Sequence, residues 1–138
     1  MSFTEGSYEK ALIALFENLG YQHQYGPNIE RDYYVPFYEE QLIESLTTIN
    51  YGKPRLAIDE AISKLKDIEI GSLPQRNELF MDYLQHGIEV SFFDGKEQRN
   101  DIIYLIDYND KNIKRNDFKV INQWTFGENS EKRADIIL

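Results

Sequence analysis

Cysteine is absent from the 138-residue sequence, so the chain has neither a disulfide framework nor a thiolate metal site. Histidine is scarce: His23 and His86 match no metal-binding spacing, and we expect both at the surface or at a helix end. No apolar run approaches the ~18 residues of a membrane span, and the first residues lack the basic start and apolar centre of a secretory signal. These absences favour a soluble cytoplasmic protein without membrane contact.

Several catalytic signatures are also missing. No Gly-rich phosphate loop follows a predicted strand, and no Ser-His-Asp or Cys-His set can be assembled. Any catalysis would therefore have to use carboxylates and a bound cation. The formal net charge of −9 argues against a free-standing nucleic-acid binder, because phosphate neutralisation needs clustered Lys and Arg. An acidic module can still act on DNA held by other domains, but acidity commonly indicates only solubility.

Apolar residues recur at helical spacing through most of the first half of the chain. The pattern predicts a first helix over about residues 8–19, capped by Thr4 or Ser7 and stopped by Gly20. Pro residues and Ser72 then mark the starts of three more helices. These begin at about Pro36, Pro54 and Ser72 and end near Asn50, Lys66 and Gly87. An exposed loop is predicted over 22–32, and a short strand over 33–35.

After residue 87 the apolar period changes from helical to twofold. The alternation over residues 88–92 predicts a strand with one solvent-exposed face, followed by a turn at Asp94-Gly95. The run 102–106 is apolar on both faces and predicts an interior strand. Residues 118–126 alternate as a third strand, and Asp135 opens a fourth. The sequence thus predicts one α/β domain over residues 1–138, with N-terminal helices followed by strands.

The last predicted strand stops at Leu138, soon after it begins. Finished domains seldom end on exposed aliphatic residues, because an unpaired apolar strand invites aggregation. We therefore expect a longer protein whose following residues complete any chemistry that Asp135 serves.

Two carboxylates are candidates for that chemistry. Asp135 lies where a polar loop enters an apolar strand, which suits a Mg²⁺ ligand because this ion needs only one or two protein carboxylates. An ordinary strand-end aspartate would look the same. Glu9 lies in the first turn of the predicted first helix, where a glutamate usually only complements the helix dipole. Proximity to Asp135 would make Glu9 a second candidate ligand.

Basic and aromatic residues give weaker signals. Lys114, Arg115 and Lys119 lead into the strand that contains Trp124, and the pair 132–133 precedes Asp135. Such residues can contact a phosphate backbone, but short charged loops are more often simply solvated. Trp124 and the tyrosines have spacings that favour core packing over base stacking.

Two stretches together resemble known nucleases. Residues 9–21 resemble the opening helix of PD-(D/E)xK nucleases, in which a Glu stands on the first helix. Residues 116–123 (Asn-Asp-Phe-Lys-Val-Ile-Asn-Gln), followed by 132–138 (Lys-Arg-Ala-Asp-Ile-Ile-Leu), resemble a narrower group. They are similar to the N-terminal domain of the R (restriction, motor-bearing) subunit of type I restriction-modification enzymes. The resemblance follows nearly the whole chain in the order of its elements.

The resemblance implies a restriction-endonuclease-like domain with a mixed β-sheet, which cleaves double-stranded DNA with Mg²⁺. The family's motif Asp corresponds to Asp135 and its helix Glu to Glu9, as catalytic residues and metal ligands. The Glu-x-Lys half of the motif has no counterpart here, nor do the ATP-dependent translocase motifs. Mg²⁺ and ATP are therefore implied for the full-length enzyme and no cofactor for this fragment, which we expect to be inactive alone. The implied partners are DNA and the modification and specificity subunits.

Two alternatives remain at this point. One is a non-catalytic module whose acidic surface docks a protein partner, and the other is a motor-less nuclease of the same fold, type III or Mrr-like. The codons after Leu138 would discriminate between these alternatives and the type I R subunit, and the docking module would be favoured if neither of the following motifs were found. A Glu-x-Lys about a dozen residues on would favour a nuclease, and a later Gly-rich phosphate loop would favour the motor-bearing form.

Overall fold

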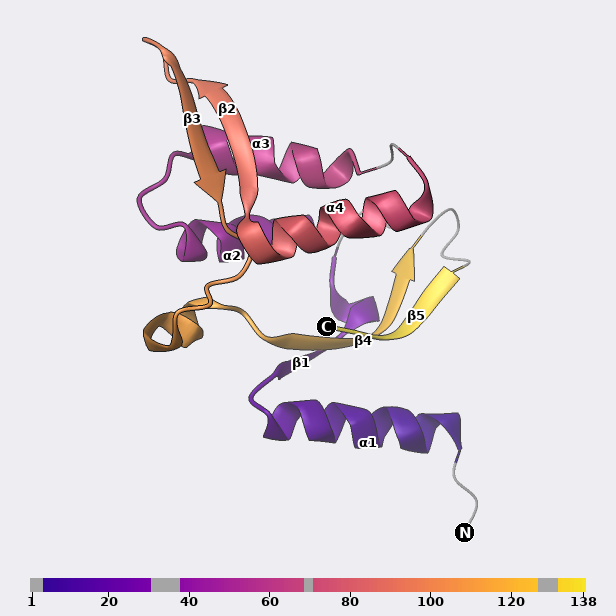
Figure 1. Cartoon of the computed structure of the whole chain (residues 1–138). Coiled ribbons are helices and arrows are strands. Elements are labelled where there is room, and N and C mark those ends of the chain that lie inside the picture. Colours follow the sequence, from indigo (N-terminus) through magenta and orange to yellow (C-terminus); the bar gives the residue numbers. More distant parts are fainter. Residues whose placement is uncertain (1–3, 31–37, 69–70, 127–131) are drawn as a thin grey trace. The chain divides into compact units, whose positions relative to one another are not determined.

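The computed structural model describes residues 4–30, 38–68, 71–126 and 132–138, and their side chains except those of 125, 126 and 132–135. The fold is mixed α/β, as predicted (Figure 1). Its contacts form two compact units. Unit 1 comprises Met1–Tyr38 and Asp117–Leu138, and unit 2 comprises Glu39–Asn116.

Unit 1 begins with helix α1 (Glu5–Asn18). The hydroxyl oxygen of Thr4 caps its N-terminus by accepting a hydrogen bond from the Ser7 N–H at 3.3 Å. Gly20, at a φ of +100°, ends it in the left-handed region, and the Tyr21 ring packs back on Phe16 with 5.1 Å between centroids. Ile13 is the buried residue of α1. Four other apolar side chains of the α1 segment are exposed: Tyr8, Leu12, Leu15 and Leu19.

The sheet of unit 1 has the strand order β1-β4-β5. Strand β1 (Gln22–Tyr25) runs parallel to β4 (Lys119–Phe126), and β5 (Lys132–Ile137) runs antiparallel to β4. Figure 1 shows α1 alongside β1 and β4, which it contacts. Val120, Ile121 and Trp124 of β4 are buried, so packing is confirmed as the role of Trp124.

The predicted exposed loop over 22–32 is wrong in its described part. Residues 22–25 form β1, and Gly26–Asn28 form a short 3-10 helix, η1. The sequence Gln-His-Gln-Tyr carries no apolar alternation, and β1 exists because β4 supplies its backbone hydrogen-bond partners. The predicted strand over 33–35 and the predicted helix start at Pro36 lie outside the described residues.

Unit 2 contains three helices and a hairpin. The helices are α2 (Glu39–Ile49), α3 (Arg55–Lys66) and α4 (Leu73–His86), close to the predicted ends. Ser72 and Gln75 form a capping box at the start of α4, and Gly87 caps its end at a φ of +82°. His86 lies at that helix end, as expected, with Nδ1 2.8 Å from Asp82 Oδ1. Within the described part of the chain, no helix has the length and apolar character needed to cross a membrane.

The core of unit 2 lies between α3 and the hairpin strand β2 (Ile88–Phe93). The alternation predicted for β2 is confirmed, because its first, third and fifth residues are buried. The apolar residues that recur at helical spacing in α3 form its buried face. The buried core residues are Leu46, Ala57, Ile58, Ala61, Ile62, Leu65, Ile88, Val90, Phe92 and Ile103.

The predicted interior strand over 102–106 is wrong. Strand β3 runs from Gln98 to Ile103, and among the described residues it pairs only with β2, antiparallel. The turn at Asp94-Gly95 sets this register, because the Asp94 carboxylate accepts hydrogen bonds from the N–H groups of Lys96 and Glu97, both at 2.9 Å. The chain leaves the ladder at Tyr104, which is held by a side chain instead.

That side chain is the amide of Asn50, the buried polar residue at the end of α2. Its Nδ2 donates to the carbonyl oxygens of Leu46 and Tyr104, both at 2.9 Å. Its Oδ1 accepts from the Tyr104 N–H at 2.8 Å. One amide thus replaces the ladder partners of Tyr104 and joins α2 to the end of β3. A short 3-10 helix, η2 (Asp110–Arg115), completes unit 2.

An ion pair gives unit 2 an acid-sensitive contact. Lys53 Nζ lies 2.9 Å from Asp101 Oδ1 and also donates to the Ile102 carbonyl. The Lys53 ammonium and then the Ile102 N–H lower the pKa of Asp101. Because this pKa is lower in the folded than in the unfolded protein, the pair stabilises the fold at pH values above the unfolded-state pKa of ~3.9. This stabilisation is lost as the pH falls through the folded-state pKa.

We therefore expect Asp101→Asn to lower the free energy of unfolding by about 0.5–1 kcal/mol at neutral pH, since the pair is partly solvated. The difference from wild type should shrink as the pH is lowered toward about 2, because protonation of Asp101 removes the same charge that the substitution removes. Urea unfolding at both pH values measures this. Asp59→Asn, which breaks the more exposed pair with Arg55, is the matched control with a smaller expected loss. An Asp101→Asn deficit that is equal at both pH values would contradict the prediction.

Candidate active site

The predicted helix carboxylate, Glu9, lies half-buried against the sheet of unit 1. It is on α1, and its Oε1 accepts two hydrogen bonds from neighbouring residues of β4. Asn122 Nδ2 and Gln123 Nε2 each donate at 2.9 Å. A glutamate that only interacted with the helix dipole would point into solvent. These two charge-assisted hydrogen bonds instead fix one carboxylate oxygen of Glu9 at the sheet.

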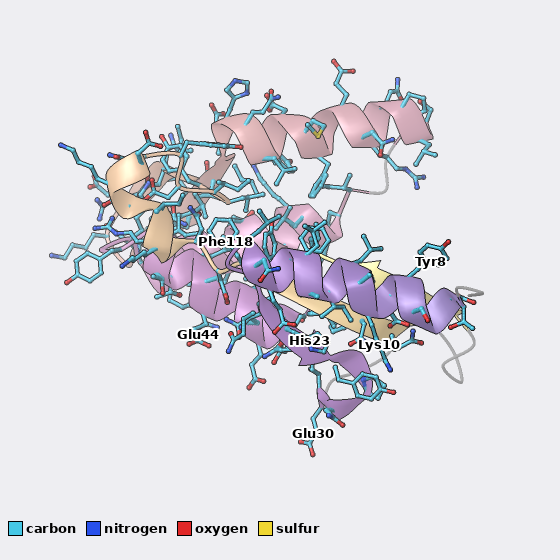
Figure 2. The ribbon with its side chains drawn as sticks, turned by 90° about the horizontal axis from the view of Figure 1, so that it is seen from below. Tyr8, Lys10, His23, Glu30, Glu44 and Phe118 are labelled. Carbon is cyan, nitrogen blue, oxygen red and sulfur yellow. The ribbon has the colours of Figure 1, made fainter. Side chains whose placement is uncertain are left out.

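A third residue extends this network. His23 Nε2, on β1, lies 2.8 Å from Asn122 Oδ1, and Figure 2 labels His23 beside α1. A carboxylate can only accept hydrogen bonds, so the Asn122 NH₂ group must face Glu9. The Asn122 oxygen then faces His23, and His23 Nε2 must carry the proton. The chain of donors runs from His23 through Asn122 to Glu9.

The backbone of β4 departs from regular strand geometry at this point. Gln123 has a φ of 55°, in the left-handed region, and is the one described non-glycine residue with positive φ. Adjacent side chains of a regular strand point to opposite faces. Here both Asn122 and Gln123 reach Glu9. Gly26 of η1 packs closely on this segment, because an added Cβ would lie 2.5 Å from the Gln123 carbonyl oxygen and 2.7 Å from that of Asn122.

Asp135 lies in β5, in the interior of the strand and not at its start, because β5 begins at Lys132. The β4–β5 register pairs Asn122 with Ile136 and Trp124 with Ala134. The backbone of Asp135 is therefore level with Gln123, the residue whose amide binds Glu9. The side chain of Asp135 lies outside the described residues, so its role as a ligand stays a prediction.

The basic candidate residues do not contact Glu9 in the part of the chain whose side chains are described, and the side chains of 132–133 lie outside that part. Lys114 and Arg115 are exposed in η2, and Lys119 binds Gln22 Oε1 at 3.2 Å. Among the residues that the structure describes, no group of three His, Cys, Asp or Glu side chains could hold a metal ion. The Glu9 carboxylate offers hard oxygen atoms, which are the kind of ligand that Mg²⁺ takes.

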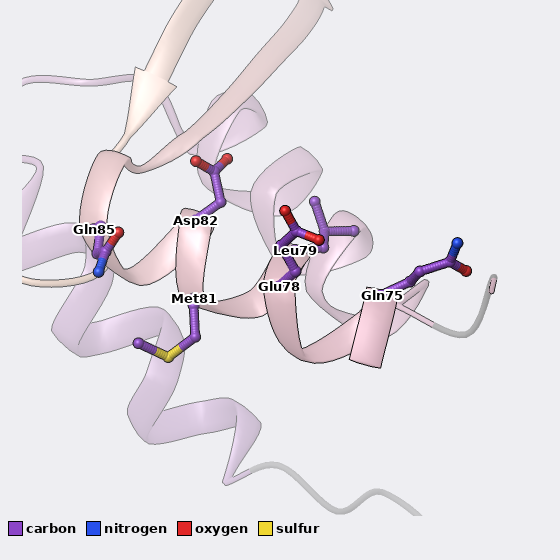
Figure 3. A pocket seen from close by; sticks show the side chains of 6 residues that line it. All are labelled: Gln75, Glu78, Leu79, Met81, Asp82 and Gln85. Carbon is purple, nitrogen blue, oxygen red and sulfur yellow. The ribbon is translucent and has the colours of Figure 1, made fainter. Parts of the chain in front are cut away.

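An open hollow of about 520 Å³ lies along α4 in unit 2 (Figure 3). The residues around it are Gln75, Glu78, Leu79, Met81, Asp82 and Gln85. Its charged groups, Glu78 and Asp82, are both acidic, which opposes binding of a phosphate backbone. This hollow is therefore unsuited to binding a nucleic acid.

Asn122, Gln123 and His23 were not predicted as site residues. The available signal was a polar Asn-Gln pair inside a strand that is otherwise apolar on its buried positions. Buried polar groups need partners, and Glu9 supplies one for both amides. His23 gave no such signal, because its contact with Asn122 joins residues 99 positions apart.

The fold and this site define a mixed α/β domain in which a helix carboxylate is fixed against a three-stranded sheet. Residues 2–138 match the family described as "Type I restriction enzyme R protein N terminus". The chain belongs to this family, as the resemblance at the sequence level predicted.

Two relatives agree with this assignment. The type I restriction enzyme HindI endonuclease subunit of Haemophilus influenzae is 25% identical over 127 residues, covering 86% of this chain and 12% of the relative. A Methanocaldococcus jannaschii protein, provisionally named the endonuclease subunit of type I restriction enzyme MjaIXP, is 27% identical over 143 residues, covering 94% and 13%. The chain thus spans about an eighth of the length of these relatives. No solved structure matches it significantly.

Proposed function

We propose that this chain contributes Asp135 and Glu9 to the Mg²⁺-dependent endonuclease centre of a type I restriction enzyme R subunit. The observation that carries the proposal is the β4–β5 register, which brings the backbone of Asp135 level with the residue that holds Glu9. The family assignment and the names of both relatives support it. In the full-length protein, cleavage of double-stranded DNA would be coupled to ATP-driven translocation.

The residues present fit Mg²⁺ because they offer hard oxygen ligands, one of them already oriented by hydrogen bonds. When bound, the ion supplies Lewis-acid polarisation of a phosphoryl oxygen and an activated water. Asp135 would be the central protein ligand, and Glu9 an outer one. A Glu-x-Lys on the following strand would add the second acidic ligand and a lysine that orients the attacking water.

The proposal also implies partners. The modification and specificity subunits of the same enzyme would select the DNA target, so this chain would need no sequence-reading surface of its own. Its net charge of −9 is compatible with that division of labour, since basic surfaces elsewhere would hold the polymer. The enzyme would act in the cytoplasm, where the DNA is found.

The test is DNA cleavage by the full-length enzyme, assembled with its partner subunits, with Mg²⁺ and ATP. We expect Asp135→Asn and Glu9→Gln to abolish or strongly reduce cleavage while ATP hydrolysis continues, because the motor motifs would lie in another part of the full-length protein. Asp59→Asn, an exposed carboxylate of unit 2, is the control and should cleave normally. Undiminished cleavage by Asp135→Asn would refute the proposal. The purified 138-residue chain should neither nick DNA nor bind Mg²⁺ tightly, and nicking that Asp135→Ala removes would contradict this expectation.

A further inference from the structure

Two neutral amides donate to Glu9. Asn122 Nδ2 and Gln123 Nε2 reach the same oxygen, Oε1, at 2.9 Å each. A lysine or arginine in their place would bring a positive charge that competes with a metal ion for the carboxylate. These two amide bonds orient Glu9 without themselves adding a positive charge. This is the type of support that metal-binding carboxylates generally receive from a surrounding shell of hydrogen bonds.

The second donor reaches Glu9 only because β4 is distorted. The left-handed φ of 55° at Gln123 breaks the alternation of the strand and brings its amide to the side of Asn122. This conformation is unfavourable for a residue with a Cβ, and such strain is concentrated at functional sites. Gly26 accommodates the distortion, since a side chain there would collide with the two carbonyl oxygens of the segment.

The first donor is held in turn by His23. The Asn122 amide could rotate by half a turn and present its oxygen to Glu9, which would repel the carboxylate. The contact from His23 Nε2 to Asn122 Oδ1, at 2.8 Å, favours the orientation in which the NH₂ group faces Glu9.

We propose that Asn122 and Gln123 are positioning residues that hold the Glu9 carboxylate in one orientation for metal binding, and that His23 acts through Asn122 by fixing its amide. The inference rests on the proposed function, because it assigns Glu9 to the metal site. It adds three residues, none of which touches the reacting atoms, so none is called catalytic.

The decisive variant is Gln123→Gly in the full-length protein. Glycine relieves the strain of the left-handed backbone, which offsets the lost hydrogen bond, so the metal-free variant should unfold at a urea concentration close to that of wild type. Loss of the amide should weaken Mg²⁺ binding, measured by titration calorimetry, by roughly tenfold or more. If Gln123 had a purely structural role, the variant would instead lose stability and Mg²⁺ affinity together.

Asn122→Ala should weaken Mg²⁺ binding by a similar factor, roughly tenfold. The matched control is Asn100→Ala, which removes an amide that bonds Ser91 across the β2–β3 hairpin. Mg²⁺ affinity should be unchanged in this control.

Two substitutions test His23. His23→Phe removes the donor to Asn122 and should weaken Mg²⁺ binding several-fold, whereas His23→Gln retains an N–H donor and should restore most of the affinity. Equal affinities in His23→Phe and wild type would overturn the role of His23.

The outcomes separate this inference from the proposed function. If Glu9→Gln weakens Mg²⁺ binding but Gln123→Gly and Asn122→Ala do not, the positioning role is wrong and the proposed function stands. If Gln123→Gly loses stability together with affinity, the residue is structural and the inference fails. If Glu9→Gln itself leaves Mg²⁺ binding and cleavage unchanged, the assignment of Glu9 to the metal site fails, and the positioning role fails with it.

Discussion

Asn50→Ala is expected to lower the free energy of unfolding by about 3 kcal/mol, because it leaves two backbone groups of Tyr104 without their partners. The Asn50 side chain is 3% exposed and makes all three of its hydrogen bonds to backbone atoms. The N–H and C=O of Tyr104 depend on it, because the β2–β3 ladder ends at Ile103. Urea unfolding at neutral pH measures the loss.

Two further variants sharpen this prediction. Thr48→Ala, which removes an exposed hydroxyl from the same helix, should change stability by no more than about 0.5 kcal/mol. Asn50→Asp keeps the acceptor for the Tyr104 N–H but places an oxygen against two carbonyls. Burial raises the pKa of such a carboxyl. The loss of stability in Asn50→Asp should therefore be largest at neutral pH and shrink as the pH falls toward ~4. A loss below about 1 kcal/mol for Asn50→Ala would show that water replaces the amide.

Gly26→Ala is expected to destabilise unit 1 by about 2–3 kcal/mol, because the added methyl group meets backbone and not a movable side chain. Its ideal Cβ position lies 2.5 Å from the Gln123 carbonyl oxygen and 2.9 Å from the carbonyl carbon of the same residue. Relief requires β4 to move away, and that movement would separate the amides from Glu9. Mg²⁺ affinity in the full-length protein should therefore fall together with stability.

Gly6→Ala is the matched control, since it makes the same chemical change in α1. Its Cβ would meet nothing closer than the Thr4 hydroxyl oxygen at 3.9 Å. Alanine in a helix is favoured over glycine by about 0.5–1 kcal/mol, so this variant should be more stable than wild type. The close approach of Gly26 to β4 predicts that the two Gly→Ala changes alter the free energy of unfolding in opposite directions. A change in the same direction for both would contradict it.

The elements that sequence predicted well are those whose signals are local. Helix α3 has its Pro54 start and its apolar stripe within one short stretch, and α4 has Ser72, Pro74 and Gly87 at its ends. Strand β1 has no local signal, since its polar sequence becomes a strand only by pairing with β4. The apolar run after Ile102 was misassigned because hydrophobicity predicts burial but not the register that the Asp94 turn imposes.

The site was predictable only in part. Glu9 and Asp135 became candidates from their positions and from the resemblance to nucleases, and periodicity alone could not have related them in space. The amides that bind Glu9 depend on a left-handed residue inside β4, and no sequence pattern signals a left-handed glutamine. Such irregular geometry is where rules based on strand alternation fail.

The order in which the chain leaves the ribosome has a consequence for unit 1. Unit 2 is a continuous segment, Glu39–Asn116, whose contacts can form as soon as it emerges. Strand β1 must wait for β4, with Gln22 and Lys119 separated by 97 positions, and Glu9 must wait for Gln123 across 114. Contacts this distant in sequence form late because a long loop has to close first. Glu9 is therefore fixed against the sheet only after β4 has formed, so a nascent chain that ends before β4 would leave this carboxylate without its two amide donors.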